Sequence, residues 1–233
     1  MPTLSPSGIV RPYWLILFVF SLLRIQAQSQ NPRTPEKYPI ANQFEHLSVE
    51  DGLSNDYVTA ILQDRDGFMW FGTGEGLNKY DGSTFTVFKP NPSQPTRSFQ
   101  NGYIMGLCEG DSTRLWAITR GGGLHEINRK TGVVTPHPIR ADQANRWNNQ
   151  HSVFVDHQHI VWVSAYAGLA RYDPARHHFT LYPPPVADVP VITAFEDRQH
   201  RFWVATHRGL YLFDRSSGRF TLVAVEGLKG PQP

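Results

Sequence analysis

The sequence predicts an all-β protein built from four four-stranded antiparallel units, the blades of a β-propeller. One observation is a tryptophan that recurs inside short apolar runs, at spacings of 46, 46 and 41 residues. Another is a Gly-Leu pair that follows each of these tryptophans by six or seven residues. A period of roughly 40 to 50 residues is typical of propellers and solenoids. The repeated positions are Trp70 and Gly76, Trp116 and Gly123, Trp162 and Gly168, and Trp203 and Gly209.

The composition agrees with this fold. The 233 residues include 29 Trp, Tyr and Phe and 19 Gly, which favours strands and tight turns. Charged residues make up 18% of the chain, too few for a disordered acidic or basic protein. No stretch after the N-terminal segment repeats its apolar residues at helical spacing, so we expect almost no helix.

Residues 1–27 have the features of a secretory signal peptide. Arg11 lies in a short positive region, and the apolar run Tyr13–Leu23 that follows is shorter than the about 20 residues of a membrane-spanning helix. Ala27 supplies the small residue at the expected cleavage site. An uncleaved anchor and a chance apolar N-terminus are the alternatives. Residues 28–43 are polar and rich in proline, and we expect an extended leader there.

Charge and cysteine content argue against a nucleic-acid-binding protein and against a protein held together by internal disulfides. Without residues 1–27, which contain Arg11, Arg24 and no acidic residue, 20 basic and 20 acidic side chains remain. The remaining chain has no basic patch of the kind that binds nucleic acid. No later segment is long enough to span a membrane. Cys108 is the single cysteine, so no internal disulfide can form, and its apolar surroundings predict a small core residue.

Residues 44–225 are expected to hold the propeller repeats, and residues 226–233 a short tail. The blades are predicted at about 53–90, 98–139, 150–185 and 190–225, and Phe44–Val49 as a strand before the first blade. Asp-Gly pairs at Asp66-Gly67 and Asp81-Gly82 indicate hairpin turns within the first blade. The strands expected in that blade are Tyr57–Gln63, Phe68–Gly72, Leu77–Tyr80 and Thr84–Phe88.

The other three blades repeat this order with looser turns. The second is expected at Tyr103–Glu109, Leu115–Thr119, Leu124–Asn128 and Val133–Thr135. The third is expected at Val153–Asp156, Ile160–Ser164, Leu169–Tyr172 and Phe179–Tyr182, and the fourth at Val191–Glu196, Phe202–Ala205, Leu210–Phe213 and Phe220–Val223. A blade buries both faces against its neighbours, so one large Trp per blade fills the space between twisted sheets. The Gly before each Leu frees the turn between the second and third strands.

The residues 52–88, GLSNDYVTAILQDRDGFMWFGTGEGLNKYDGSTFTVF, resemble the two-component regulator propeller repeat. That repeat builds the periplasmic sensor half of hybrid histidine kinases, in which a phrase such as FEHLSVEDGLS, here Phe44–Ser54, precedes the blades. The resemblance covers residues 44–225. The second unit departs from it, with Asn128 where the other units have Asp81, Asp173 and Asp214.

The resemblance implies a periplasmic sensor that recognises oligosaccharides and signals across the membrane. Family members carry many more blades, a membrane helix and a kinase core, whereas this sequence has four units and no phosphoacceptor or ATP-binding motif. We therefore expect a truncated, non-enzymatic segment that forms an incomplete arc of a larger propeller. Further blades or a partner chain would then cap its open edge.

Candidate chemistry is sparse. His157 and His159 have the spacing of half a metal site, and Asp64-x-Asp66-Gly67 resembles the opening of a calcium loop, but each lies where other units have a plain turn. No catalytic constellation has a supporting motif. No metal, cofactor or catalytic residue is therefore predicted.

Loops at one end of a propeller line a funnel, where aromatic and Arg side chains can stack on a small-molecule ligand such as an oligosaccharide. Candidates at strand starts or before the Gly-Leu turns are Tyr57, Arg120, Tyr166 and Arg208. Blade packing or solvated loops remain the alternative for each residue. For the whole chain, the alternatives are a free-standing propeller enzyme, such as a polysaccharide lyase or hydrolase, and a propeller that binds only protein.

Overall fold

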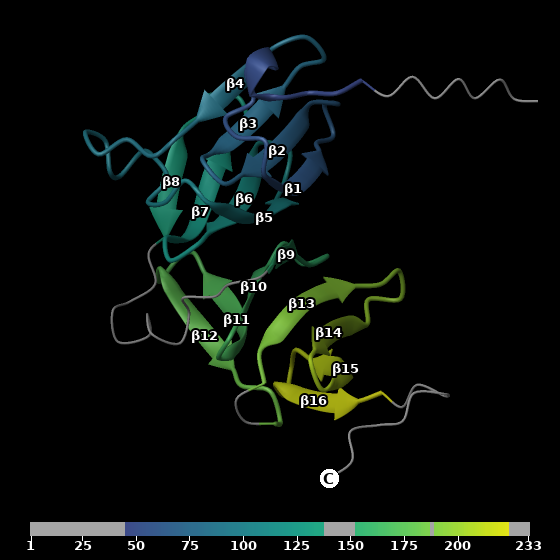
Figure 1. Ribbon diagram of the computed structural model, residues 1–233. Coiled ribbons are helices and arrows are strands. Elements are labelled where there is room, and N and C mark those ends of the chain that lie inside the picture. Colours follow the sequence, from purple (N-terminus) through teal and green to yellow (C-terminus); the bar gives the residue numbers. More distant parts are fainter. Residues whose placement is uncertain (1–44, 138–151, 187–188, 224–233) are drawn as a thin grey trace, which may run out of the picture. The chain divides into compact units, whose positions relative to one another are not determined.

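A computed structural model describes residues 45–137, 152–186 and 189–223 (Figure 1). The predicted signal peptide, the leader and the C-terminal tail lie outside these residues. Four sheets follow one another along the chain, and each has four antiparallel strands in sequence order. The predicted all-β propeller architecture is confirmed.

The strands have the following bounds. Sheet 1 holds β1 (Val58–Gln63), β2 (Met69–Thr73), β3 (Leu77–Tyr80) and β4 (Phe85–Phe88). Sheet 2 holds β5 (Ile104–Glu109), β6 (Arg114–Thr119), β7 (Gly123–Asn128) and β8 (Val134–His137). Sheet 3 holds β9 (Ser152–Val155), β10 (Val161–Ala165), β11 (Gly168–Asp173) and β12 (His178–Tyr182). Sheet 4 holds β13 (Val191–Glu196), β14 (Phe202–Thr206), β15 (Gly209–Asp214) and β16 (Arg219–Leu222).

The prediction of a strand at Phe44–Val49 is wrong for residues 45–49, which the structure describes. Residues 45–48 form no regular element, and the chain then enters the short 3₁₀ helix η1 (Val49–Asp51). The Asp51 carboxylate accepts a 2.8 Å hydrogen bond from the Ser48 N–H, and the Ser48 hydroxyl accepts one from Glu50 N at 3.2 Å. Such local side-chain bonds give the backbone an alternative to strand pairing.

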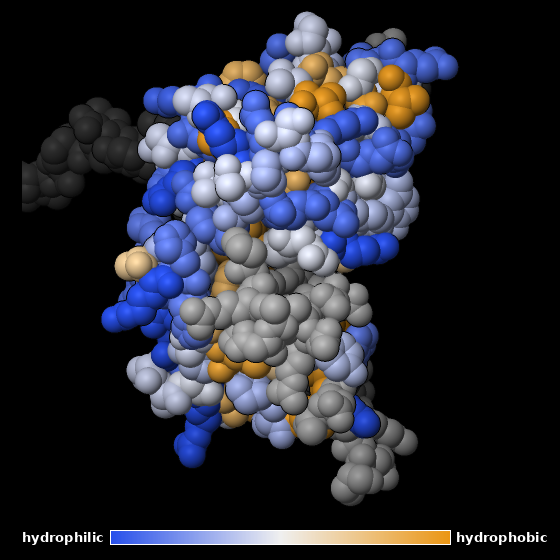
Figure 2. Space-filling model, turned by 90° about the vertical axis from the view of Figure 1, so that its left-hand side faces the viewer, coloured by the Kyte–Doolittle hydropathy of each residue, from blue (hydrophilic) through white to orange (hydrophobic). Residues whose placement is uncertain are grey.

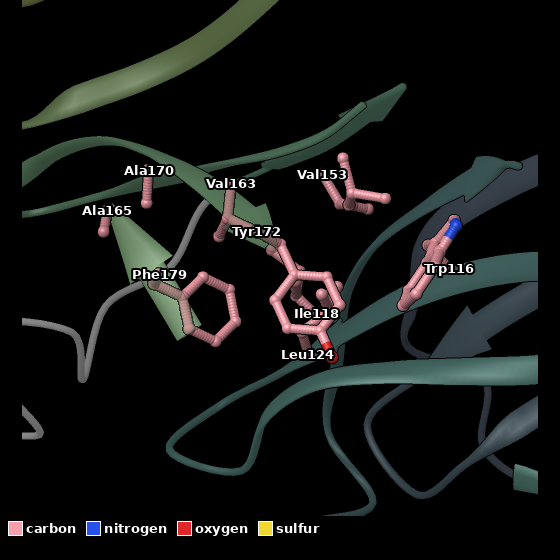
Figure 3. Packing of buried hydrophobic residues seen from close by; sticks show 10 residues of the cluster. Trp116, Ile118, Leu124, Val153, Val163, Ala165, Ala170, Tyr172 and Phe179 are labelled. Atoms are coloured by element: carbon pink, nitrogen blue, oxygen red, sulfur yellow. The ribbon is translucent and has the colours of Figure 1, made fainter. Parts of the chain in front are cut away.

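The hydrophobic core consists of three layers, each between two successive sheets. Trp70 of sheet 1 packs with Ile104 and Leu115 of sheet 2, and Trp162 of sheet 3 packs with Val204 and other residues of sheet 4. Figure 3 shows the middle layer, where Trp116, Ile118 and Leu124 of sheet 2 meet a larger group from sheet 3. That group is Val153, Val161, Val163, Ala165, Ala170, Tyr172 and Phe179.

Exposure of the repeated tryptophans follows from this stacking. Trp70, Trp116 and Trp162 are 0%, 4% and 1% exposed, because the following sheet covers each of them. Trp203 is only partly buried, and Phe195, which pairs with it across β13 and β14, is 48% exposed. One face of sheet 4 therefore has no covering sheet among the described residues.

Each of the following contacts between successive sheets is made with the first strand of the later sheet. The Thr59 hydroxyl donates to the Ile104 carbonyl at 2.6 Å, and the Ser164 hydroxyl donates to the Ile192 carbonyl at 3.0 Å. A Cβ atom on Gly72 would lie 2.7 Å from Cγ2 of Ile104, so only glycine allows the contact there. The hydrogen bond from Thr59 and the absence of a side chain on Gly72 together fix how sheets 1 and 2 pack on each other.

The Gly of each Gly-Leu pair has a positive φ angle, from 85° at Gly123 to 152° at Gly76. At Gly168 a Cβ would lie 2.3 Å from the Tyr182 carbonyl oxygen. At Gly76 and Gly168, the absence of a side chain therefore lets the chain pass beside the backbone of the fourth strand. None of the helical structure within the described residues is long and apolar enough to cross a membrane.

Candidate functional site

The four predicted ligand-binding residues lie at one end of the sheets. Tyr57 stands just before β1, and Arg120, Tyr166 and Arg208 stand between the second and third strands of sheets 2, 3 and 4. In an antiparallel sheet these positions share an end, and the turns after the first and third strands share the other end. We call them the Tyr57 end and the Asp64 end.

At the Tyr57 end, two of the predicted residues, Tyr57 and Arg120, both lie against Tyr103. The rings of Tyr57 and Tyr103 lie 6.1 Å apart, and the Arg120 guanidinium lies 3.9 Å from the centre of the Tyr103 ring. Tyr57 is 63% exposed. This cluster presents an aromatic surface with hydroxyl groups and a cation, which is a suitable surface for a neutral polar ligand.

Local backbone contacts position these side chains. Asn55 and Asn101 each accept the N–H of the tyrosine two residues later, at 2.8 Å in both cases. The Arg120 N–H donates to the Tyr103 carbonyl at 2.9 Å. Hydrogen bonding with Tyr57 and burial raise the pKa of Tyr103, against the opposing effect of Arg120. Tyr103 therefore stays a neutral donor and acceptor at physiological pH.

The other two predicted residues stand on other sheets. Tyr166 is 46% exposed, and Arg208 is exposed, with its backbone N–H donating to the Thr206 hydroxyl at 3.1 Å. No contact joins either side chain to Tyr57, Tyr103 or Arg120 within the described ranges. The structure thus groups Tyr57 with Arg120 and leaves Tyr166 and Arg208 apart from them.

The Asp64 end is organised by hydrogen bonds from the repeated tryptophans. The indole nitrogens of Trp70, Trp162 and Trp203 donate to Asp64, Asp156 and Asp197 at 2.8, 2.9 and 2.8 Å. The second carboxylate oxygen of each aspartate accepts two backbone N–H groups of its turn. Burial by itself would raise the pKa of Asp64, but the bonds from Trp70 and the Phe68 N–H outweigh it and hold the pKa below its usual value. The carboxylate is therefore a charged, fixed part of the turn.

An ion network links sheet 1 to sheet 2 at this end. The Arg129 guanidinium lies 3.1 Å from Asp64 and 3.2 Å from Glu109, and its side chain is 2% exposed. Glu109 also binds Arg65 at 2.8 Å. Sheets 3 and 4 repeat this arrangement, because Arg215 lies 3.0 Å from Asp156 and 2.8 Å from Glu196.

His157 takes the place of Arg65 in the second network. Its backbone N–H donates to Glu196 at 2.7 Å, and its Nδ1 lies 2.6 Å from the same carboxylate. With His200 these residues form the group within the described chain whose ligand atoms, all within 4.8 Å of one another, could hold a metal ion. Arg215 already supplies a positive charge to Glu196, so the cluster is complete as an ion network.

The histidines predicted as half a metal site are separated by their turn. His159 has a φ angle of 61° and His200 one of 59°, and both stand where the first turn has Gly67 at 90°. This left-handed position closes the turn, since His159 N donates to the Asp156 carbonyl at 2.9 Å, as Gly67 N does to Asp64. His157 is instead directed toward Glu196 of the next sheet.

A cavity of about 520 Å³ lies beside the second network. Trp162, Arg171, Phe202 and Arg215 are among the residues that line it. On the face seen in Figure 2, most of the described residues are hydrophilic, with some hydrophobic residues among them.

Comparison with known proteins agrees with this geometry. Residues 52–75 match the family model described as two component regulator propeller. The chain carries this propeller repeat. A stretch of 82 residues is 38% identical to histidine kinase P4 of Formosa agariphila, which covers 35% of this chain and 5% of the kinase.

Solved structures support the propeller fold. The extracellular domain of a hybrid two component system from B. thetaiotaomicron matches 76% of this chain and 31% of its own, with a TM-score of 0.57 and 23% identity. Virginiamycin B lyase from Staphylococcus aureus matches 75% of this chain and 58% of its own, with a TM-score of 0.60 and 12% identity. The chain thus spans a small part of the kinase and about a third of the extracellular domain.

Tyr103 was not predicted as a member of the Tyr57 end. Asn-Asp-Tyr at residues 55–57 returns as Asn-Gly-Tyr at residues 101–103, so the equivalent position was visible in the sequence. The ion networks were not predicted either, although Glu109 and Glu196 end the first strands of their sheets and Arg129 and Arg215 follow the third. The repeat shows which positions are equivalent, but only the folded chain shows that these side chains meet.

Proposed function

We propose that this chain is the exported, ligand-sensing propeller segment of a hybrid two-component sensor histidine kinase, acting in the periplasm without catalytic activity of its own. The similarity to a histidine kinase and the propeller repeat support the sensor role. The sequence features of residues 1–27 support export.

We further propose that the Tyr57 end binds an oligosaccharide. The observation that carries this is the contact of Arg120 with Tyr103, 3.9 Å from its ring centre, beside the exposed ring of Tyr57. Sugar rings have apolar C–H faces that pack on aromatic rings and hydroxyl groups that bond to phenol and guanidinium groups. Signalling across the membrane would require parts of the sensor outside this segment.

Calorimetric titration of the chain with a panel of oligosaccharides tests this proposal. A binder in the panel should lose about tenfold or more in affinity in Tyr57→Ala and in Arg120→Ala, as expected for the loss of one principal contact. Arg176→Ala is the matched control, because its side chain is 81% exposed and lies at the Asp64 end. Absence of binding across the panel would favour a propeller that binds only protein.

Turnover of a bound oligosaccharide would instead favour the enzyme alternative. The assay is product analysis after incubation of the chain with the same panel. The sensor proposal requires that each ligand is recovered unchanged.

We also propose that a further blade, or a partner chain, covers the free face of sheet 4. Phe195 is 48% exposed there, and Trp203, Leu210 and Leu212 are partly buried, whereas the corresponding faces of sheets 1 to 3 are covered. Exposed apolar faces of this kind promote association. Size-exclusion chromatography should show self-association of the chain that Phe195→Lys reduces, and a compact monomer at all concentrations would contradict the proposal.

A further inference from the structure

The turn between β9 and β10 carries a histidine where the corresponding turn of sheet 1 carries an arginine. Arg65 Nε donates to Glu109 at 2.8 Å, and His157 Nδ1 lies 2.6 Å from Glu196 at the equivalent place. The backbone N–H of each residue also donates to the same glutamate. Glu109 thus contacts two guanidinium groups, whereas Glu196 contacts one guanidinium and an imidazole. An imidazole can bind a metal ion, which a guanidinium cannot.

A second histidine joins this pair from the turn between β13 and β14. His200 follows Glu196 by four residues, and its Nδ1 lies 3.7 Å from the same carboxylate oxygen. The imidazole rings of His157 and His200 lie 4.1 Å apart. Between sheets 1 and 2 the two histidine positions are held by Arg65 and Thr113. Both metal-binding side chains are therefore peculiar to the interface between sheets 3 and 4, when the two ion networks are compared.

The three possible ligand atoms have nearly the spacing that a zinc ion needs. They all lie within 4.8 Å of one another. A tetrahedral Zn²⁺ ion with bonds of roughly 2.0 to 2.1 Å holds its ligands about 3.4 Å apart. The 2.6 Å contact of His157 must open by about 0.8 Å, and the 3.7 Å contact of His200 must close by about 0.3 Å. These two side chains are 35% and 61% exposed, so they can turn, and an ion can reach them from solvent.

Arg215 does not exclude an ion from these atoms. It lies 2.8 Å from Glu196, but it is also held 3.0 Å from Asp156 and donates to the His200 carbonyl at 3.3 Å. A carboxylate offers about four lone-pair positions, so Glu196 can contact the guanidinium and a metal at once. A bound ion takes the place of the proton between His157 and Glu196 and leaves the contact of Arg215 with Asp156 intact.

From these observations we propose that the turns of sheets 3 and 4 bind Zn²⁺ or a similar divalent transition-metal ion. The ligands are His157 Nδ1, Glu196 Oε1 and His200 Nδ1, and solvent supplies the fourth. Imidazole and carboxylate suit Zn²⁺, whereas Mg²⁺ and Ca²⁺ take about six or more oxygen ligands. Because His157 belongs to sheet 3 and the other two ligands to sheet 4, the ion joins the two sheets. This site lies at the Asp64 end and does not depend on the proposed oligosaccharide function.

Calorimetric titration of the untagged full chain with Zn²⁺ tests this site. Binding should be saturable, with one ion per chain and a dissociation constant in about the micromolar range. Mg²⁺ should show no saturable binding at the same concentrations. In the isotope-labelled chain, Zn²⁺ should shift the imidazole resonances of His157 and His200. The resonances of His207, which stands between β14 and β15 at the Tyr57 end, should stay unmoved.

Two variants borrow residues from the turn of sheet 1 and should therefore keep the fold. His157→Arg supplies the side chain that Arg65 provides beside Glu109. His200→Gly suits a φ angle of 59°, because glycine adopts positive φ freely. Each variant should weaken Zn²⁺ binding by about tenfold or more, since even the loss of a group that only supports a metal ligand costs roughly 10- to 100-fold. His159→Gly is the matched control at another left-handed position, with φ of 61°, and should leave Zn²⁺ affinity unchanged.

The proposal is overturned if Zn²⁺ shows no saturable binding below about millimolar concentration. Unchanged Zn²⁺ affinity in folded His157→Arg or folded His200→Gly would place the ion elsewhere and also overturn it. If one variant does not fold, as its circular dichroism would show, the other variant and the imidazole resonances of the unaltered chain decide. Bound Zn²⁺ should also raise the thermal midpoint of the unaltered chain and not that of His157→Arg, because only the former holds the ion in its folded state.

Discussion

Arg129 of sheet 2 lies 3.1 Å from Asp64 of sheet 1, and both side chains are at most 2% exposed. The arginine thus connects two successive sheets through a carboxylate that already holds the turn and the tryptophan of its own sheet. Removing one partner of such a buried pair leaves the other charged and unpaired.

Arg129→Ala should lower the free energy of unfolding by about 3 to 5 kcal/mol, the usual range for breaking a buried ion pair. The measurement is urea denaturation followed by tryptophan fluorescence. Arg176→Ala, which breaks an ion pair whose arginine is 81% exposed, should cost about 1 kcal/mol or less. Equal costs for the two variants would show that burial of Arg129 adds nothing.

Trp162→Phe and Trp116→Phe should differ in cost, although both residues are nearly fully buried. Loss of the Trp162 indole removes one hydrogen bond to an Asp156 oxygen that still accepts from Arg215, a penalty of about 1 kcal/mol beyond the lost packing. Loss of the Trp116 indole strands no acceptor. Denaturant midpoints and slopes give the difference, and a larger cost for Trp116→Phe would contradict the hydrogen-bond assignment.

His125 should stay neutral in the folded chain well below the usual titration range of histidine. Burial lowers its pKa to about 3, an adjacent Gly123 backbone bond opposes the shift, and His137 adds to it. The unfolded chain takes up this proton near pH 6.5, so folded-state stability should decrease as the pH falls from 6.5 toward 3. A proton-detected titration of the imidazole resonances tests this, and an inflection near pH 6.5 for His125 would be inconsistent with its burial.

Cys108 should react slowly with alkylating reagents. Burial raises its pKa to about 11, with a further contribution from Glu109 and an opposing backbone bond from Val155. Because the thiolate is the reactive form, alkylation at pH 8 should be roughly a hundredfold slower than for a free cysteine. Iodoacetamide labelling followed by mass spectrometry gives the rate, and urea-unfolded chain serves as the control that restores it. Rapid labelling of the folded chain would place Cys108 at the surface.

The period of the sequence was sufficient to predict the fold, because each Trp and Gly-Leu pair marks the same two strands in every sheet. The strand expected at Phe44–Val49 failed because Ser48 and Asp51 bond to their own backbone, a local effect that apolar alternation does not reveal. Tyr57 and Arg120 were selected one by one, and their common contact with Tyr103 needed the tertiary structure.

The ion networks lay beyond prediction for a related reason. Asp64, Glu109 and Arg129 come from three different turns and strand ends of two sheets, so their sequence separations carry no recognisable motif. The indole N–H of Trp116 has no aspartate acceptor, unlike those of Trp70, Trp162 and Trp203, because Gly110 occupies the aspartate position. This difference becomes apparent only when the four tryptophans are compared in the folded chain.

Alternation of these networks has a mechanical consequence for the stacked sheets. Buried ion networks join sheet 1 to sheet 2 and sheet 3 to sheet 4. Sheets 2 and 3 instead meet through apolar contacts, such as those of Trp116 with Tyr172, and through the 2.7 Å hydrogen bond between the Tyr172 hydroxyl and His137. Under tension or partial denaturation, the sheets should separate first at the interface between sheets 2 and 3. Sheets 1 and 2 would then stay together as one unit, and sheets 3 and 4 as another.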